Sequence, residues 1–285
     1  MNHVFFCCSI IICVLVQANC QTTATFDALK DNTIYENDGT LSNGAGSILY
    51  AGQTQRFLSR RALLKFDVST IPTGANITAV ALKTYCNRTV TVGTTATLHR
   101  VLKDWGEQTA TVNQSEGQGS PAAPGDATWT HNSFSFSTWA SVGGDYAPIA
   151  SASKVVDEGI YVHWSSATIN NDVQDWISGS PNHGWIIIGD ESLLGSILRF
   201  NSRENPDNPP ILEISYTVPS LCSNTNQTLQ GQIPSGTYQA SQQISIDAGI
   251  VTSGSSVTVR AGSCILVSAD SELNGETELI IGPCQ

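Results

Sequence analysis

Short segments in which apolar and polar side chains alternate recur through the sequence up to about residue 217. Three of them are "RALLKFDV" at 61–68, "AVALKTYC" at 79–86 and "TATLHRVL" at 95–102. A period of two is typical of a β-strand with one face in a core, whereas a helix repeats every 3.6 residues. Charged residues make up only 13% of the chain, and Gly, Ser, Thr and Asn are abundant. This pattern predicts an all-β protein with many turns.

One segment has the period of a helix instead. In "TINNDVQDWISG", residues 168–179, the apolar side chains of Trp176 and Ile177 follow Val173 at spacings of three and four residues, and Gly179 comes directly after them. Glycine commonly ends a helix because it adopts the left-handed backbone conformation without strain. The sequence therefore predicts a short helix here.

The N-terminus carries the pattern of a secretory signal. The apolar run from Val4 to Val16 is shorter than the roughly 20 residues that a membrane-spanning helix needs. Cleavage after Cys20 would leave Ala18 and Cys20 as the small residues of a signal-peptide cleavage site. Residues 1–20 are therefore predicted to be a signal peptide, and the mature protein is expected to be extracellular or attached to the cell surface. No later segment is apolar enough to predict a membrane span.

The character of the sequence changes after Tyr216. The segment 218–226 is rich in Ser and Asn, and residues 227–285 contain short β-branched runs, frequent turns and almost no aromatic side chains. Such residues are small for a sandwich core but suit the stacked coils of a small β-solenoid. We therefore predict a first domain at 24–217, a linker at 218–226 and a solenoid-like β-rich unit at 227–285.

Four cysteines follow the predicted signal peptide, and they allow three pairings. Cys222 and Cys284 bracket the C-terminal unit and are the preferred candidates for a disulfide. Cys86 falls inside a strand pattern, where a buried unpaired thiol is the usual outcome. The sequence alone does not select among the pairings.

The basic residues are unevenly distributed in a chain whose net charge is −11. Residues 56–103 contain a single acid, Asp67, and eight of the thirteen Lys and Arg residues: Arg56, Arg60, Arg61, Lys65, Lys83, Arg88, Arg100 and Lys103. Such segregation can create a local positive field on an acidic protein. A nucleic-acid partner is not expected, because the overall charge is acidic and the context is extracellular.

A series of motifs, taken together and in the order in which they occur along the chain, resembles the DNRLRE domain, which is also classed as carbohydrate-binding module family 96. The motifs are, in chain order, "KDNTIYEN", "RALLKFDVSTIPTGANITAVAL", "DATW", "WASVGGDY", "DVQDWISG", "HGWIII" and "FNSRENPDNPPILEISY". Of the six residues that name the family, Arg203 and Glu204 are matched. The resemblance implies a jelly-roll-like antiparallel β-sandwich in an extracellular protein, with alginate as an associated ligand. The segment 227–284 is similar to C-terminal segments of secreted proteins from Bacteroidetes-type bacteria.

The strand that begins at Ile197 supplies two candidate ligand contacts. Arg199 and Arg203 lie on one face, and Phe200 and Glu204 lie on the other. Phe200 marks the core side, so Glu204 is predicted to be structural, bound to an arginine or to loop amides, because an unpaired buried charge is very costly. Arg199 and Arg203 are then available to a ligand.

Arg61 and Lys65 likewise share one face of their strand. If this strand neighbours the strand of Arg199 and Arg203, the four cations form a platform for the carboxylates or sulfates of an acidic glycan. The alternative is that both are ordinary solvated faces.

Two tryptophans are candidate sugar contacts. Trp129 and Trp139 flank the segment "THNSFSFST", and a flat ring offers an apolar face to the C–H side of a sugar. The alternative is that both rings pack in the core or among loops.

Evidence for catalysis or metal binding is weaker. The sequence contains no G-x-S-x-G motif and no closely spaced His and Cys or Glu metal motif. His99, Arg100 and Tyr85 are the residue types of a polysaccharide lyase, which keeps an enzyme as a minority hypothesis. Oxygen ligands for a structural Ca²⁺ are available near the N-terminus, without the spacing of a defined calcium loop, at Asp27, Asp31, Glu36, Asn37 and Asp38.

These observations favour a secreted, non-catalytic protein that binds an acidic, alginate-like polysaccharide. A structural protein of the cell surface or matrix is the alternative, and a polysaccharide lyase or hydrolase is the third hypothesis. The sequence does not predict the oligomeric state.

Overall fold

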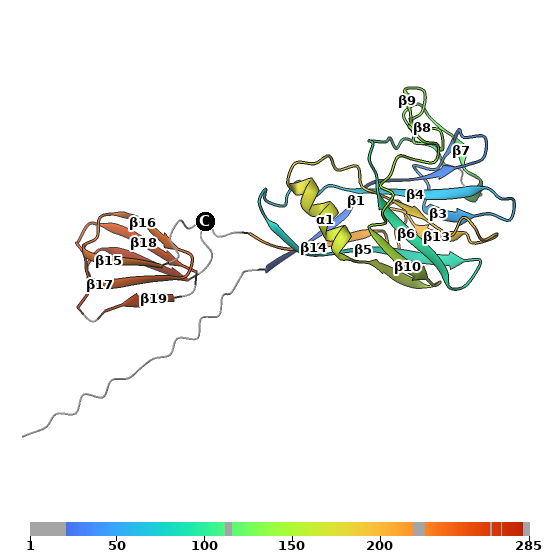
Figure 1. Ribbon diagram of the computed structural model, residues 1–285. Helices are drawn as coiled ribbons and strands as arrows, with labels where there is room; N and C mark the ends of the chain where they lie inside the picture. Colours follow the sequence, from blue (N-terminus) through green and yellow to red (C-terminus); the bar gives the residue numbers. More distant parts are fainter. Residues whose placement is uncertain (1–20, 112–115, 219–225, 263, 269, 282–285) are drawn as a thin grey trace, which may run out of the picture. The chain divides into compact units, whose positions relative to one another are not determined.

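The chain divides into two compact units, one of which is the segment Gln21–Val218 (Figure 1). The computed structural model describes residues 21–111, 116–218, 226–262, 264–268 and 270–281. The predicted signal peptide and the two cysteines of the predicted disulfide, Cys222 and Cys284, lie outside these described residues.

The first unit is an antiparallel β-sandwich with one α-helix, as the sequence predicted. The helix is α1 (Ala167–Ile177), and a 3₁₀ turn covers Glu116–Gln118. The strands are β1 (Gln21–Tyr35), β2 (Leu41–Ser42), β3 (Ile48–Gln53), β4 (Ser59–Phe66), β5 (Asn76–Thr89), β6 (Thr94–Arg100), β7 (Ser120–Pro121), β8 (His131–Ser133), β9 (Ser137–Thr138), β10 (Ala152–Val156), β11 (Ile160–Trp164), β12 (Trp185–Ile188), β13 (Leu198–Asn201) and β14 (Ile211–Thr217).

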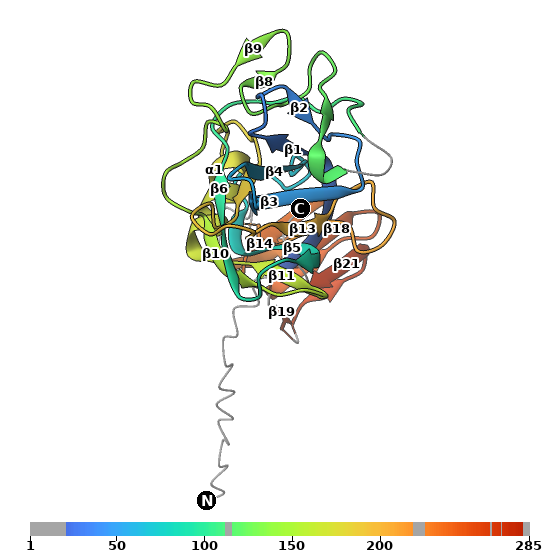
Figure 2. The same cartoon turned by 90° about the vertical axis from the view of Figure 1, so that its right-hand side faces the viewer.

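The strands form two layers. One layer is built around β5, which pairs with β11 on one edge and with β14 and β13 on the other; β13 continues to β3. The second layer runs from β10 through β6 and β12 to β4. β3 lies between β4 and β13, as Figure 2 shows, so it joins the layers at that edge.

β1 takes part in both layers. Its first residues, Gln21 to Asp27, pair with β14, and its last residues pair with β4. The change follows an irregularity between Ala28 and Lys30, and an extra residue of this kind bends a strand and redirects its pairing. β1 therefore closes the sandwich along a second edge.

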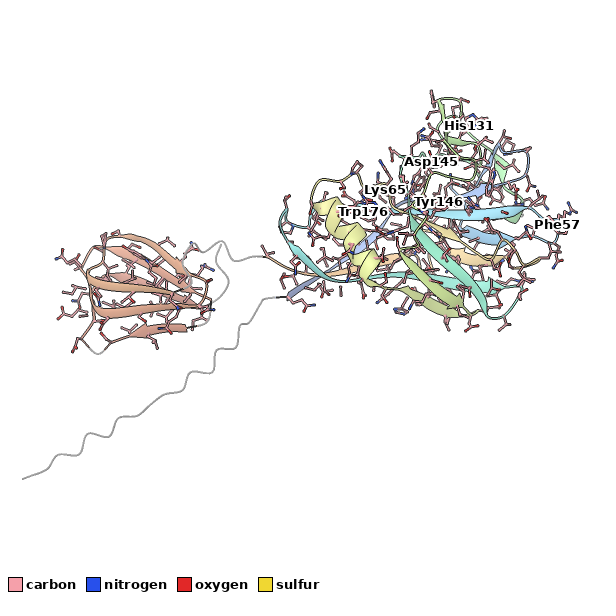
Figure 3. All side chains as sticks on the ribbon, in the orientation of Figure 1. Phe57, Lys65, His131, Asp145, Tyr146 and Trp176 are labelled. Carbon is pink, nitrogen blue, oxygen red and sulfur yellow. The ribbon has the colours of Figure 1, made fainter. Side chains whose placement is uncertain are left out.

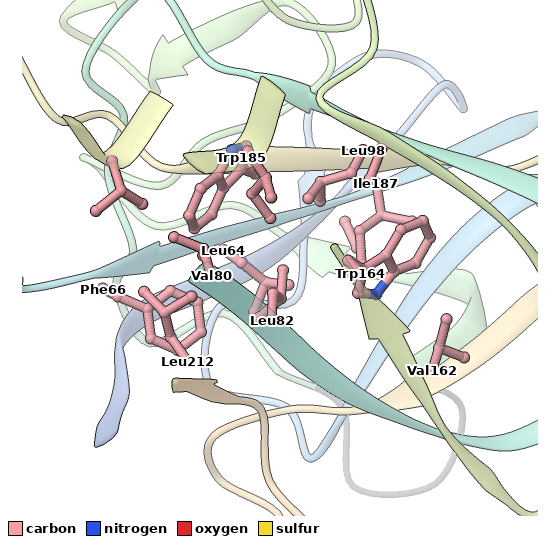
Figure 4. Close-up of a cluster of buried hydrophobic side chains, with 14 of the residues drawn as sticks. Leu64, Phe66, Val80, Leu82, Leu98, Val162, Trp164, Trp185, Ile187 and Leu212 are labelled. Atoms are coloured by element: carbon pink, nitrogen blue, oxygen red, sulfur yellow. The ribbon is translucent and has the colours of Figure 1, made fainter. Parts of the chain in front are cut away.

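The main core fills the space between the layers (Figure 4). The predicted alternation places Ala62, Leu64 and Phe66 of β4 in this core, fully buried, opposite Leu82 of β5. The ring of Trp164 is also fully buried, and its indole N–H donates to the Thr84 hydroxyl at 3.0 Å, so its polar group is satisfied.

A second cluster covers the other face of β4, for which the sequence left two alternatives, a ligand platform or a solvated face. Leu63 on this face is fully buried against side chains of β1, β12 and the long connection between β6 and β10: Ile34, Val101, Trp105, Ala127, Trp129, Trp139 and Ile186. Both alternatives required an exposed face, whereas residues distant in sequence fold over it. β4 is therefore buried on both sides.

The helix forms where its period predicted it. The Ser166 side chain caps its N-terminus by accepting from the Ile169 N–H at 3.1 Å. Val173 and Trp176 are buried, and the Trp176 ring centroid lies 4.5 Å from that of Trp185. Gly179 has a φ of +107°, the conformation that favours glycine after a helix.

The second unit consists of parallel strands in two sheets. β15 (Asn226–Gln232), β17 (Gln243–Val251), β19 (Cys264–Val267) and β20 (Glu272–Leu273) form one sheet, in which β17 is central. β16 (Gly236–Ala240), β18 (Ser256–Ala261) and β21 (Glu276–Ile281) form the other. Consecutive strands such as β15 and β16 lie in different sheets, and each sheet grows by parallel pairing, which is the arrangement of a β-solenoid, as predicted. Its core is aliphatic, with buried residues such as Ile244, Ile246, Val257 and Val259.

Cys86 is a buried free thiol in β5, as its strand position predicted. Burial raises the pKa of this thiol to about 11, so the reactive thiolate is scarce at neutral pH. In the part of the chain that the structure describes, no helix is long and apolar enough to cross a membrane.

Replacing Leu82 by Ala tests the sandwich core. Leu82 is fully buried, so the Leu82→Ala variant is expected to lower the free energy of unfolding by about 2–5 kcal/mol through lost burial and a residual cavity. Denaturant unfolding measures this, with Val155→Ala, at a side chain 60% exposed, as the control. Equal losses in the two variants would contradict the core assignment.

Candidate functional site

The two strands that carry the predicted cations are not neighbours. β4 carries Arg61 and Lys65, β13 carries Arg199, and β3 lies between these strands; Arg203 follows β13 in a turn. The four cations therefore do not form the shared platform that the sequence suggested. The intervening strand is the partner of β4 in a hairpin, a pairing that the charge pattern does not reveal.

Arg61 is enclosed within the sandwich unit. Its Nε and Nη2 donate to the two carboxylate oxygens of Glu191 at 2.7 and 2.8 Å, and its Nη1 donates to the Gly143 carbonyl at 2.8 Å. Its guanidinium lies 4.7 Å from the ring centroid of Trp129, and only 11% of the side chain is exposed. Arg61 thus holds loops against β4 and has no donor pair left for a carboxylate ligand.

The other candidates on this side of the sandwich are also engaged internally. Lys65 Nζ lies 3.4 Å from a carboxylate oxygen of Asp104, which Lys30 shares at 3.2 Å. Trp129 and Trp139 are both buried, and the indole N–H of Trp139 donates to a backbone carbonyl at 2.8 Å. Neither ring offers a face to a sugar, so their role here is packing.

Arg203 and Glu204 belong to a cluster of one cation and three carboxylates. Arg203 Nη2 donates to Glu107 at 2.6 Å and to Glu204 at 2.9 Å, which gives Glu204 the arginine partner predicted for it. Glu107 also accepts the Asp31 N–H at 2.9 Å, and Asp31 accepts the Arg203 N–H at 2.7 Å. The cluster ties β1 to the turn after β13.

Burial dominates the electrostatics of this cluster. Only 6% of the Glu107 side chain is exposed, and burial raises its pKa from 4.5 to about 7 despite the bond from Arg203. Burial, reinforced by the Glu204 charge, also raises the pKa of Asp31 well above its usual value. One Asp31 oxygen, Oδ1, is buried without a hydrogen-bond partner. The cluster is therefore a structural element whose stability depends on protonation.

The residues considered for a lyase do not come together. His99 Nδ1 contacts the Ala147 carbonyl at 2.8 Å, and Arg100 donates to Asp175 at 2.7 Å, both on β6. Tyr85 lies on β5, in the other layer. The three residues therefore do not form a catalytic set.

The oxygens considered for calcium have separate partners. The Glu36 carboxylate accepts the Ser59 N–H at 2.6 Å, whereas Asp38 accepts from Thr40 within its own turn. Within the described ranges, no three His, Cys, Asp or Glu side chains gather into a group that would hold a metal. Asp27 and Asp31 lie on β1, and Asn37 follows that strand.

The outer face of the β5 layer presents an open basic hollow. Its volume is about 240 Å³, and it is lined by Tyr50, Arg88, Val90, Ile197 and Arg199. None of these lining residues is acidic. Within the described residues, neither guanidinium forms an ion pair with a carboxylate, so both remain available to an anionic ligand.

A β-bulge assembles this hollow. Arg199 pairs with Tyr50 of β3 on one side and with Arg88 of β5 on the other, which puts the three side chains on one face. Phe200 pairs with Cys86, so Asn87 is the extra residue. Without this bulge, strict alternation would place Arg88 on the core side with Cys86. The Asn87 side chain accepts from Arg199 Nε at 2.5 Å and orients that guanidinium.

Aromatic and polar side chains continue from the hollow across the same face. Tyr85 pairs with Tyr161 of β11, and their ring centroids lie 5.3 Å apart in an edge-on arrangement. His163 is exposed on β11 opposite Lys83, whose ammonium lies 2.5 Å from Glu213. Sequence analysis found Arg199 here but missed Arg88 and the tyrosines. The alternation within "AVALKTYC", read outward rather than toward the core, could have found Tyr85. Arg88 lies beyond this segment, after a bulge that alternation does not reveal.

The outer sheet face of the antiparallel sandwich is therefore both basic and aromatic. Residues 22–130 match the family model of carbohydrate-binding module family 96. The match covers part of the sandwich unit and supports a carbohydrate-binding role. The matched segment includes Tyr50 and Arg88, whereas Arg199 and Tyr161 follow it. Comparison with curated proteins gives no match.

The raised pKa of Glu107 predicts a pH-dependent stability. Its carboxyl keeps a proton in the folded state up to about pH 7, whereas the unfolded chain releases it near 4.5. The folded state binds more protons in this window, so the free energy of unfolding should fall as pH rises from about 4.5 to 7, by at most about 1.4 kcal/mol per pH unit for one proton.

The Glu107→Gln variant should show a smaller fall over that window, because the amide does not ionise. Urea unfolding at several pH values measures the slope, with Asp157→Asn at an exposed position as the charge-matched control. A slope in Glu107→Gln equal to that of the wild type would contradict the assignment.

Proposed function

We propose that this protein is a secreted, non-catalytic module that binds an acidic polysaccharide along the outer face of its β5 layer. The hollow of Tyr50, Arg88 and Arg199 would bind a carboxylate-bearing sugar, and the row of Tyr85 and Tyr161 would extend the contact to neighbouring sugars. Alginate is the ligand class we favour.

The observation that carries this proposal is the charge of the hollow. On a chain of net charge −11, the hollow is lined by two arginines and no acid. A guanidinium donates two parallel hydrogen bonds to a carboxylate, which a neutral sugar does not offer. Burial raises the pKa of Tyr50, so its hydroxyl stays protonated and can donate to a sugar oxygen.

The alternative of a structural surface protein is favoured by one finding, the enclosed Arg61. That side chain, which sequence analysis assigned to a ligand, is used to hold loops. The Arg88 side chain is exposed and the Arg199 side chain is partly exposed, which favours ligand binding instead.

Removing both guanidiniums of the hollow tests the proposal. The Arg88→Ala/Arg199→Ala variant should bind alginate at least about tenfold more weakly than the wild type, because a hydrogen bond to a charged group contributes about 1.5–3 kcal/mol. Retention on an alginate gel at low and high salt measures this, and wild-type retention should weaken with salt.

The control variant is Lys154→Ala, which removes a cation from β10 in the other layer. Unchanged retention of the double variant would exclude this hollow as the binding site. Release of unsaturated sugars during the incubation would show a lyase and contradict the non-catalytic assignment.

A further inference from the structure

A second hollow lies at the end of the sandwich where β3 turns into β4. Its volume is about 540 Å³, within the range of small-molecule sites. It is lined by Asn37, Leu41, Thr54, Gln55, Arg56, Leu58, Arg60, Gly117, Gln118 and Gly119. The lining combines two arginines with three side-chain amides and a hydroxyl, and it contains no acid.

The two arginines have different environments. Arg60 is buried, with its guanidinium 4.7 Å from the Tyr35 ring centroid and its Nη1 bonded to the Ser59 carbonyl at 2.9 Å. Arg56 is exposed on the hairpin. Within the described residues, neither guanidinium forms an ion pair with a carboxylate; the Glu36 carboxylate, which accepts the Ser59 N–H, interacts with Arg60 from a greater distance.

The wall opposite the hairpin is rigidly held. The Glu116 carboxylate accepts from three neutral donors at 2.9–3.0 Å: Asn43 Nδ2, Ser47 Oγ and the Ile48 N–H. The Tyr35 hydroxyl donates to the Glu116 carbonyl at 2.6 Å. Gly119 has a φ of +73°, and a Cβ there would lie 2.9 Å from the Tyr35 ring. Residues 116–119 are therefore held in place by these bonds, and position 119 requires glycine.

The hairpin adds an exposed aromatic ring beside the hollow. Phe57, next to Arg56, is 67% exposed and has a φ of +61°. Figure 3 shows it at the outer end of the unit. A bulky residue in this backbone region is strained, and such strain concentrates at ligand-binding sites. The conformation holds the ring in solvent, where a sugar face can stack on it.

We infer that this end hollow is a second site for a carboxylate-bearing sugar, distinct from the hollow of Arg88 and Arg199. Arg56 and Arg60 supply the charge for the carboxylate, the amides of Gln55 and Gln118 supply partners for hydroxyls, and Phe57 supplies the stacking face. The inference rests on the proposed function for the ligand class, but it concerns a separate set of residues.

The two hollows are close enough to serve one chain of sugars. A Cβ on Gly117, which lines the end hollow, would lie 3.4 Å from the ring of Tyr50, which lines the other. A long acidic polysaccharide can therefore contact both sites, and linked weak contacts raise the overall affinity. A disaccharide is the better probe because it is too short to report on both sites together.

Titration of the ¹⁵N-labelled protein with a mannuronate disaccharide, followed by NMR, tests the inference. We expect two groups of amides to shift, one at 54–58 and 117–119 and one around Arg88 and Arg199. Arg56→Ala should weaken saturation of the first group at least about tenfold and leave the second unchanged. Arg56→Lys should restore part of it, Lys154→Ala should alter neither, and cellobiose should shift the first group much less.

The possible failures are distinguishable. Shifts around Arg199 without shifts at 54–58 and 117–119 would overturn the second site alone. A first group whose saturation is insensitive to Arg56→Ala would also overturn it. Shifts at 54–58 and 117–119 that depend on Arg56, without shifts around Arg199, would support the second site and overturn the proposed one. No shifts in either group would overturn both.

Discussion

β1 takes part in both layers of the sandwich, and the placement of the other strands depends on this continuity. Its first half pairs with β14 and its second half with β4, so one strand fixes how far apart and at what angle the two sheets lie. The core side chains, such as Leu82 from one sheet and Leu98 from the other, fill the space that this crossing sets. The cluster around Arg203 adds a second tie, because it joins β1 to the turn after β13.

This closure decides which basic side chains remain available. The face of β4 that carries Arg61 lies under the long connection between β6 and β10, so the guanidinium donates to Gly143 of that connection and to Glu191, which lies between β12 and β13. The outer face of β5, β13 and β3 has no such cover, and Arg199 and Arg88 stay without carboxylate partners among the described residues. An acidic protein can thus present two hollows lined by arginines, and the acid nearest the end hollow, Glu116, is used as a hydrogen-bond acceptor within the fold.

Features set by local sequence were predictable, and features set by distant contacts were not. The helix follows from its own period and its glycine, and the solenoid follows from small side chains in short runs. Arg88 was missed because a bulge shifts the alternation by one residue, and alternation alone assigns it to the core side. The enclosure of Arg61 was missed because Glu191 is remote in the chain. The need for glycine at position 119 was not predicted for the same reason, because it arises from a contact with the ring of Tyr35, which is distant in sequence.

The pairing of Gln21 with Thr217 places the two ends of the sandwich side by side. The end hollow lies beyond Tyr35, at the opposite end of β1, whose length along the strand is about 45 Å at about 3.3 Å per residue; the bend after Ala28 makes the direct distance shorter. A sandwich attached through either end therefore behaves as a spacer that holds its basic hollow away from the attachment point. Adjacent ends also make the unit suitable for insertion into a surface loop of another protein, where it would add reach without separating the host strands.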